Sequence, residues 1–408
     1  MTNKIKLNGL SLFSSAGIGE TYIHDYVNVK VSNELLKDRC KLYNHFYPDV
    51  DMVCGDIRDN KLYKSIVNKS KKQKVNFIYA TPPCQSFSKA GKQTVNDRRD
   101  ILFTYIINIA KDIKPSYILI ENVPEFIKLD ILLKNTKTTV INVFTKELGY
   151  LYTINYGILD SADFGTAQKR KRAIILLSKK SPSINEWVFP RPLNYKLTVK
   201  DVIGDLPSLE SGESSDFHLW HKAKTHNDRH ILWMSHTPTG KTAFENKIHY
   251  PEKNGRKIKG FKTTYKRMCW DNPAPTITMA NGSISSQNNV HPGRIKPDGT
   301  YDNARVLTVY ELMLLTGLKK DWKIPDWATD VLLRHVLGEC VPPLLIKHLL
   351  DNIGKDSKVD YDDDDDDDDD ESKLKQQTMY ELKKLCKKRG IKGYSKLNKK
   401  NLVELAMS

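Results

Sequence analysis

The sequence predicts an α/β protein with a doubly wound sheet, because short apolar runs alternate with helix-like stretches through its first 180 residues. The runs at 10–13, 77–80, 117–120 and 173–177 contain four or five mostly aliphatic or aromatic residues, flanked by Gly, Pro or polar residues. Continuous apolar runs of this length are typical of parallel strands that are buried on both faces. With 408 residues, 39% of them hydrophobic, the chain can bury a sizeable core.

Helical spacing of apolar residues marks 101–113 and 140–148, which lie between predicted strands. From about 181 to 300 the periodicity fades, while Pro, Gly, Asn and His become more frequent. We interpret this region as a second, loop-rich domain inserted before a helical segment at 307–316. The first domain then resumes at 301–354.

Charge is unevenly distributed along the chain. The 65 Lys and Arg against 49 Asp and Glu give a formal net charge of +16, which favours a polyanionic partner such as nucleic acid. Residues 355–371 carry twelve acidic residues against two lysines, whereas 373–408 carry eleven basic residues against two glutamates. A long run of like charges repels itself, so we interpret the acidic segment as a disordered linker. The predicted domains are 1–180 plus 301–354, the loop-rich region 181–300, the linker 355–372 and a small basic module 373–408.

Other features exclude several protein classes. No apolar run reaches the roughly 18 residues that span a bilayer, and the first residues do not resemble a secretory signal. The six cysteines are scattered without a CxxC pair, which predicts neither a disulfide framework nor a zinc site. Five irregularly spaced histidines without nearby cysteines are interpreted as surface residues: His218, His221, His226, His230 and His236. We expect a soluble, intracellular protein that binds no metal.

The first predicted strand runs into a turn of small residues, Leu12-Phe-Ser-Ser-Ala-Gly-Ile-Gly19. Small residues after a buried strand let the backbone approach a ligand, and the next helix supplies unpaired N–H groups. A tight turn that serves packing alone is the alternative. Two acids follow: Glu34, which could accept bonds from ribose hydroxyls, and Asp56, which could bind an adenine amino group. Their order and spacing favour a cofactor that contains a nucleoside.

A cysteine follows the predicted strand 77–80, in Thr81-Pro-Pro-Cys-Gln-Ser-Phe-Ser-Lys-Ala-Gly91. Ligands bind at the carboxyl ends of strands in a doubly wound sheet, so a stiff Pro-Pro segment presents Cys84 at the mouth of the cleft. A lone intracellular cysteine is most often a buried structural residue. Its polar neighbours favour a reactive role here.

These residues resemble the catalytic loop of DNA (cytosine-5) methyltransferases, which reads Pro-Pro-Cys-Gln-x-Phe-Ser-x-Ala-Gly. Two positions depart from the family pattern: Ser15 replaces the first glycine of the first motif, and Glu339 stands where Asn is commoner in the tenth. The family's other motifs occur in the family's order within residues 7–350. Segment 12–19 resembles the first cofactor motif, and 97–102 resembles the helix-start motif that follows. Segments 120–124 and 168–172 resemble the Glu-Asn-Val and Gln-x-Arg-x-Arg motifs. Segments 305–311 and 338–343 resemble the ninth and tenth motifs.

The resemblance implies a Rossmann-like class I S-adenosylmethionine-dependent methyltransferase sheet, with 181–300 as the target-recognition domain. It implies S-adenosyl-L-methionine as cofactor and double-stranded DNA as substrate. The cofactor contacts that it implies come from Phe13, Ser15, Gly17, Gly19, Glu34, Leu35, Asp56, Ile57, Pro82, Leu102, Glu339, Cys340 and Val341.

The resemblance also assigns catalytic roles. Carbon 5 of cytosine is too weak a nucleophile to accept a methyl group unaided, and thiolate addition at carbon 6 converts the ring into a nucleophilic enamine. Cys84 would be the nucleophile, and Glu121 would hold or donate a proton at N3, for which burial should raise its pKa. Asn122 would orient the loop. Arg170 and Arg172 would reach the base O2, the Glu121 carboxylate or the target phosphate.

A base inside a duplex is out of reach of the nucleophile, so the target cytosine must be flipped out. Loop 86–96 would be the mobile lid, and segments 257–262 and 283–289 could contact phosphates and base edges. Segment 272–278 could be a rigid turn that supports the site, or it could be purely structural. The residues expected to contact DNA are Gln85, Ser86, Ser88, Gln93 and Arg267.

The basic module 373–408 resembles a SAP-type DNA-binding module, although a generic basic helix pair is the alternative. We hypothesise that it adds non-specific DNA affinity through counterion release, and that the aspartate run competes with DNA for it.

Two other functions are weighed for the whole chain: a tRNA cytosine-5 methyltransferase and a catalytically inactive DNA-binding homologue. The large 181–300 region, the catalytic-loop sequence and the tail favour duplex DNA, and the intact catalytic residues argue against inactivity. We expect a monomer, with any cognate restriction endonuclease acting separately, in the cytoplasm of a prokaryote or virus-infected cell, or in a nucleus.

Overall fold

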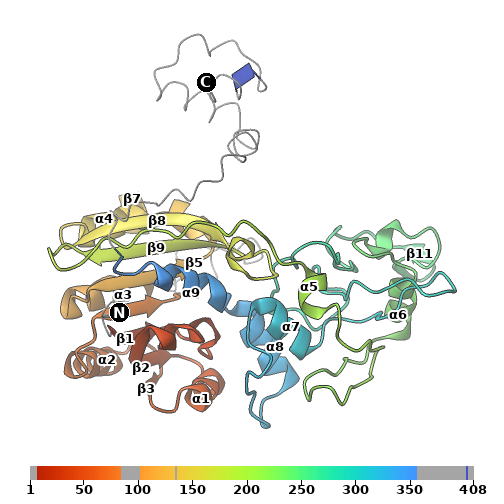
Figure 1. The fold of residues 1–408 in the computed structure, drawn as a ribbon, viewed down its shortest axis with the longest axis horizontal. Helices are drawn as coiled ribbons and strands as arrows, with labels where there is room; N and C mark the ends of the chain where they lie inside the picture. Colours follow the sequence, from red (N-terminus) through yellow and green to blue (C-terminus); the bar gives the residue numbers. More distant parts are fainter. Residues whose placement is uncertain (1–6, 84–101, 134–135, 356–400, 403–408) are drawn as a thin grey trace, which may run out of the picture. The chain divides into compact units, whose positions relative to one another are not determined.

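A seven-stranded sheet forms the centre of the computed structural model, which describes residues 7–83, 102–133, 136–355 and 401–402. The strand order is β3-β2-β1-β4-β5-β9-β8 (Figure 1). The strands of this sheet are β1 (Leu7–Leu12), β2 (Val27–Glu34), β3 (Asp51–Cys54), β4 (Phe77–Ala80), β5 (Tyr117–Asn122), β8 (Tyr152–Asp160) and β9 (Lys171–Lys179).

Strands β1 to β5 of the sheet pair in parallel, whereas β9 runs antiparallel to both of its neighbours, β5 and β8. The four apolar runs of the sequence lie in β1, β4, β5 and β9, as predicted. Every residue of β4 and β5 is buried, because helices cover both faces of the sheet. That burial explains why these strands have continuous apolar runs rather than alternating ones. The predicted α/β class is confirmed.

Helices cover both faces of the sheet, and each face has its own hydrophobic core. One core joins apolar side chains of the sheet to α2, α3 and α4, and the other joins the opposite side chains to α1 and α9. The helices are α1 (Lys37–Phe46), α2 (Asn60–Lys72), α3 (Leu102–Ile113), α4 (Val140–Leu148), α7 (Val309–Thr316), α8 (Asp330–Glu339) and α9 (Pro343–Asp351). The segments expected at 101–113, 140–148 and 307–316 correspond to α3, α4 and α7. Thr308 and Glu311 form a capping box that begins α7 after its predicted start.

Short elements complete the described chain. A small hairpin follows β5, and two short helices and a second small hairpin lie within 181–300. These elements are β6 (Asp130–Leu133), β7 (Thr136–Thr139), α5 (Val199–Ile203), α6 (Asp228–Ser235), β10 (Glu252–Lys253) and β11 (Arg256–Lys257). The 3-10 turns are η1 (Ile18–Glu20), η2 (Ile23–Asp25), η3 (Pro124–Lys128), η4 (Ser161–Phe164) and η5 (Ala243–Glu245).

The region 181–300 is largely irregular, as the loss of periodicity predicts (Figure 1). It has a small core of its own that includes Trp233, Met234 and Val290. The side chain of Arg267 is fully buried beside this core, and it donates hydrogen bonds to the carbonyl oxygens of Met234, His291 and Asn303. The prediction that Arg267 contacts DNA is therefore wrong. Its guanidinium is buried, and its N–H groups donate to carbonyl oxygens of loops in this region instead.

Two further expectations need correction. His221 is not a surface residue: its ring is buried, with Nδ1 3.1 Å from Thr308 Oγ1 and Nε2 2.9 Å from the carbonyl oxygen of Pro207. Cys40 and Cys54 form a disulfide, although the scattered cysteines gave no sign of one. Helix α1 packs beside β3, which brings the two Cα atoms to 6.1 Å, within the usual range for a disulfide.

The chain divides into a body that extends to Ser357 and a second unit, 358–408. The predicted linker spans this division. The predicted SAP-like module lies outside the described residues except for 401–402. Within the described part of the chain, helices are too short or too polar to cross a bilayer. The same residues contain no cluster of three or more His, Cys, Asp or Glu that could hold a metal ion.

Candidate active site

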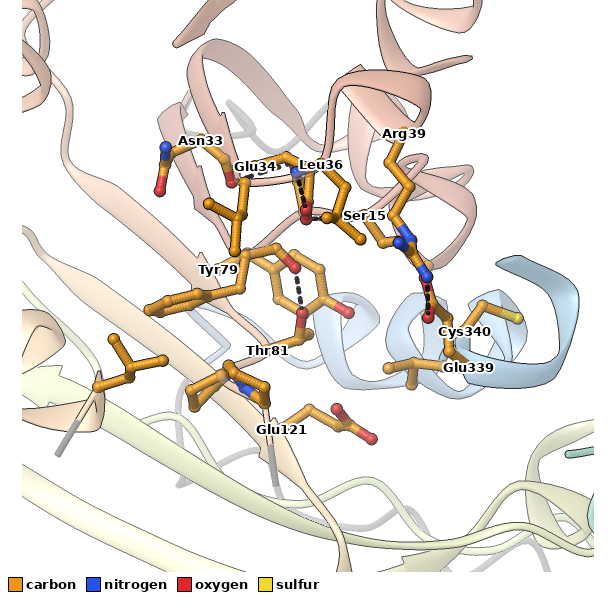
Figure 2. Close-up of a pocket in the computed structure, with 18 of the residues that line it drawn as sticks. Ser15, Asn33, Glu34, Leu36, Arg39, Tyr79, Thr81, Glu121, Glu339 and Cys340 are labelled. Carbon is orange, nitrogen blue, oxygen red and sulfur yellow. Dashed lines mark hydrogen bonds and ion pairs between the residues drawn. The ribbon is translucent and has the colours of Figure 1, made fainter. Parts of the chain in front are cut away.

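A cavity of about 490 Å³ lies at the carboxyl ends of the parallel strands (Figure 2). Its wall is formed by the turns that follow β1, β3 and β4, by the last residues of β2 and β5, and by the junction of α8 and α9. This is the edge of a doubly wound sheet at which ligands bind, because strand ends and loops converge there. The sequence placed its predicted cofactor residues at the same edge.

Twelve of the thirteen predicted cofactor residues line the cavity: Phe13, Ser15, Gly19, Glu34, Leu35, Asp56, Ile57, Pro82, Leu102, Glu339, Cys340 and Val341. The thirteenth, Gly17, does not line it. Gly17 has a φ of +74°, and a Cβ at this position would lie 2.5 Å from the ring of Tyr47. Gly17 therefore shapes the turn and lets it pack against α1, rather than forming part of the cavity wall.

The turn after β1 is tied to the acid at the end of β2. The N–H of Ser15 donates to Glu34 Oε2 at 2.9 Å, and the N–H of Leu36 donates to Glu34 Oε1 at 2.8 Å. Burial raises the pKa of Glu34, although these hydrogen bonds and the charge of Arg39 act in the opposite direction. The two backbone donors fix the direction of a carboxylate that still faces the cavity (Figure 2).

A second acid, Asp56, lines the cavity after β3. Arg58 contacts both carboxylate oxygens of Asp56, at 2.6 to 3.0 Å. These hydrogen bonds from Arg58 lower the pKa of Asp56. The acid is thus an acceptor in its ionised form, beside the apolar side chains of Ile57 and Leu102.

Glu121, near the end of β5, is buried in the cavity wall and pairs with Arg172 of β9. Arg172 Nε lies 2.6 Å from Glu121 Oε1. Burial raises the pKa of Glu121, as predicted, against the opposing charges of Arg172 and Arg170. The register of β5 and β9 places the two strands side by side, which a linear motif could not show.

Arg170, which was assigned the same catalytic role as Arg172 from the sequence, lies in a different place. It does not line the cavity, and its guanidinium donates to the carbonyl oxygens of Ile277, at 2.7 Å, and Glu339, at 2.9 Å. Arg170 thereby joins the backbone of the 272–278 segment to the end of α8. These two hydrogen bonds place Arg170 behind the cavity wall, where it holds the two backbone segments in position.

The segment 272–278 supports the strand that carries Arg172. The N–H of Lys169 donates to the carbonyl oxygen of Ala274 at 2.8 Å, and the N–H of Ile277 donates to Gln168 Oε1 at 3.1 Å. Gly338 lets α8 approach this segment, because a Cβ there would lie 2.3 Å from the carbonyl oxygen of Thr278. Of the two roles open to the segment, the contacts support a rigid turn behind the site.

Hydrogen bonds hold the base of the cysteine loop. Asn122 Nδ2 donates to the carbonyl oxygen of Pro82 at 3.0 Å, and Thr81 Oγ1 donates to the carbonyl oxygen of Phe13 at 2.8 Å. Pro82 and Pro83 line the cavity. The four predicted site residues that follow, Cys84, Gln85, Ser86 and Ser88, lie outside the described residues, as does Gln93.

Sequence reasoning missed Tyr79, whose side chain enters the cavity wall from β4 (Figure 2). Its hydroxyl is buried and has no hydrogen-bond partner among the described residues. Gly19 leaves room for it, since a Cβ there would lie 2.9 Å from the hydroxyl oxygen. Because protein atoms already close off this oxygen, Tyr79 forms part of the packed wall of the cavity. Only its apolar strand context was visible in the sequence.

The donors and acceptors of the cavity suit S-adenosylmethionine. Glu34 and Asp56 are carboxylate acceptors in the wall, as the prediction of ribose and adenine contacts requires, and apolar side chains such as Ile57 and Leu102 line the same cavity. A mostly parallel sheet with one antiparallel strand and such a cavity at its carboxyl edge defines the class of S-adenosylmethionine-dependent methyltransferases.

Residues 7–355 match the family model of the C-5 cytosine-specific DNA methylases, and the chain belongs to this family. It is 49% identical over 357 residues to the Type II methyltransferase M1.HgaI of Avibacterium volantium, covering 86% of this chain and 99% of that protein. The Type II methyltransferase M1.HphI of Haemophilus parahaemolyticus is 27% identical over 363 residues, or 86% and 87% of the two chains. The solved structure of the Entamoeba histolytica methyltransferase EhMeth shares the fold, with a TM-score of 0.58 at 17% identity, covering 85% of this chain and 98% of that one.

Proposed function

We propose that this DNA cytosine-5 methyltransferase transfers the methyl group of S-adenosylmethionine to a cytosine flipped out of a specific duplex site, through a temporary bond from Cys84 to carbon 6. The observation that carries the proposal is the buried Glu121–Arg172 pair. The pair shares one cavity with the predicted cofactor residues and with the Pro-Pro segment that precedes Cys84.

The proposed reaction begins with addition of the Cys84 thiolate to carbon 6 of the ring. The electron pair of the 5,6 double bond moves into the ring, and Glu121 supplies a proton at N3, so that carbon 5 becomes nucleophilic. The cofactor would supply an electrophilic methyl group to carbon 5 from its sulfonium sulfur, which keeps the electron pair of the broken bond and leaves as a neutral thioether. A water or hydroxide then removes the carbon 5 proton, the bond from carbon 6 to sulfur breaks, the thiolate leaves, and the N3 proton returns to the Glu121 carboxylate.

The electrostatics of the pair suit this role of Glu121. A proton donor must hold its proton at neutral pH, and burial raises the pKa of Glu121 in that direction. Arg172 keeps the carboxylate in one orientation at 2.6 Å and would supply positive charge beside the exocyclic O2 of the base. The two residues therefore stabilise the charge that thiolate addition places on the N3 and O2 side of the base.

The region 181–300 would recognise the DNA target. Lys257, Lys259 and Lys262 are exposed there, where they could contact phosphates. The identity to M1.HgaI, whose name marks it as a Type II methyltransferase, supports a protective role beside a separate restriction endonuclease. We infer a monomeric, intracellular enzyme that associates with DNA.

Trapping on duplex DNA that contains 5-fluorocytosine tests the proposal, because fluorine at carbon 5 prevents the final elimination. The wild type should form a covalent adduct, and C84A should form none. C269A is the matched control, since Cys269 is a free cysteine that does not line the cavity. Labelled cofactor offered with duplex DNA or with tRNA identifies the substrate. Transfer to tRNA alone, or an adduct that persists in C84A, would overturn the proposal.

A further inference from the structure

The two departures from the family's motifs contact each other. Ser15 stands where the first motif has glycine, and Glu339 stands where the tenth motif more often has Asn. They are 324 residues apart in the sequence, yet Ser15 Oγ donates to Glu339 Oε1 at 2.5 Å. A glycine at position 15 would have no side-chain donor for this bond. One departure supplies the donor and the other supplies a charged acceptor, which makes them a matched pair.

Arg39, in the first turn of α1, completes the arrangement. Its Nε lies 2.7 Å from Glu339 Oε1 and its Nη2 lies 2.8 Å from Oε2 (Figure 2). This two-point contact fixes both the distance and the plane of the carboxylate. The side chains of Arg39 and Glu339 are only 11% and 24% exposed, so solvent screens the pair less than a surface ion pair.

Ser15 is held from two directions. Its hydroxyl is bonded to Glu339, whereas its N–H donates to Glu34 Oε2. Its φ of +49° lies in the left-handed region, which a non-glycine residue adopts only when its surroundings hold it there. Ser15, Glu34, Arg39 and Glu339 all line the cofactor cavity. The orientation of Glu34, the acid assigned to the ribose, thus depends on the turn that Glu339 holds.

We propose that Arg39 is a positioning residue for cofactor binding, and that it acts through Glu339 and Ser15. The ion pair fastens the end of α8 to α1 and to the turn after β1, and it neutralises one of two carboxylates that face the same end of the cavity. Without Arg39, the charges of Glu339 and Glu34 repel each other and the turn loses its fixed position. The proposal rests on the proposed function, because it assigns this cavity to S-adenosylmethionine.

The test compares R39Q, E339Q and the double variant. We expect R39Q to raise the KM and the Kd for S-adenosylmethionine about tenfold, with kcat at saturating cofactor and the KM for DNA within about twofold of wild type. R39K, which keeps the charge, should recover part of the affinity. Because Arg39 acts through Glu339, the double variant should bind no more weakly than R39Q, and the cycle should be non-additive. K69Q, which breaks an exposed ion pair with Asp51, is the matched control.

S15A is a second, milder test, since alanine removes only the hydroxyl. We expect it to raise the Kd for the cofactor about threefold in the wild-type background and to have no effect in E339A, where the acceptor is gone. Additive effects of R39Q and E339Q would overturn the proposal, as would an R39Q variant that lowers kcat as strongly as it raises the KM. Measuring the Kd for the cofactor by calorimetry separates this test from the test of the proposed function. If the wild type bound the cofactor but transferred no methyl group, the proposed reaction would be refuted. The Kd values of the Arg39 and Glu339 variants could still be compared.

Discussion

Replacing Glu121 by glutamine removes the proposed proton donor while preserving the shape of the side chain. Glutamine cannot deliver a proton to N3, so the ring gains less stabilisation when the thiolate adds. General acid catalysis contributes about 10²–10⁴-fold to rates, and we expect E121Q to lower kcat by this factor. The loss corresponds to about 3–5 kcal/mol of barrier. Binding of the cofactor should change little, since Glu34 and Asp56 lie elsewhere along the wall.

The same variant should fold normally. Burial raises the pKa of Glu121, so its ionised form costs the folded state free energy at neutral pH. The stability that this group contributes is fully present below its unfolded-state pKa and is lost as the pH rises through the higher folded-state pKa. The neutral amide avoids that loss, and its oxygen can still accept from Arg172. We therefore expect the free energy of unfolding at pH 8 to stay within about 1 kcal/mol of wild type.

Initial rates of methyl transfer measured against pH, together with thermal melts, check both expectations. The wild-type rate should fall as the pH rises through the raised pKa of Glu121, whereas the residual rate of E121Q should lack this fall. E125Q serves as the control, because Glu125 lies four residues further along and does not line the cavity. An E121Q rate within tenfold of wild type, with an unchanged pH profile, would refute the assigned role.

Three further changes test the cysteine-loop support, the packing behind the site and the basic module. N122A removes the hydrogen bond to the carbonyl oxygen of Pro82, so kcat should fall about tenfold with an unchanged cofactor Kd; a lower cofactor affinity with unchanged kcat would contradict this. G338A places a Cβ 2.3 Å from the Thr278 oxygen and should cost about 1–3 kcal/mol in urea unfolding, whereas G157A, with 3.5 Å to its nearest neighbour, should cost less; equal losses would argue against close packing there. Deleting 355–408 should weaken DNA binding at low salt and flatten its salt dependence, and an unchanged salt slope would exclude a contribution from the basic module.

The strands and helices that could be predicted were those whose local pattern is strong. The runs that became β4 and β5 are buried on both faces, so their apolar character needs no partner to be recognised. Strand β8 was missed because it lies at the edge of the sheet, where intermediate and exposed residues such as Tyr156 interrupt the apolar pattern. Helices α1 and α2 have polar compositions, and their amphipathic faces are recognised only once the sheet is known.

Polar residues were harder to assign than apolar ones. Arg267 is a basic residue in a basic segment, as is typical of residues that contact DNA. Its N–H groups, however, donate to carbonyl oxygens of loops that are distant in sequence. Arg39 and Tyr79 carry no motif signal, and both became visible only in the assembled cavity wall. The role of a charged or hydroxyl side chain depends on the group that it contacts, and the tertiary fold determines which group that is.

The sequence by itself determined the α/β class and the order of the motifs, and it predicted the chemistry of Cys84, because these depend on local apolar runs and on short, contiguous residue patterns. Only the tertiary structure decided which side chains meet. It paired Glu121 with Arg172 across β5 and β9, and it brought Ser15 and Glu339 together from opposite ends of the body. The physical reason is that hydrogen bonds and ion pairs act over a few ångströms in space, whatever the separation along the chain.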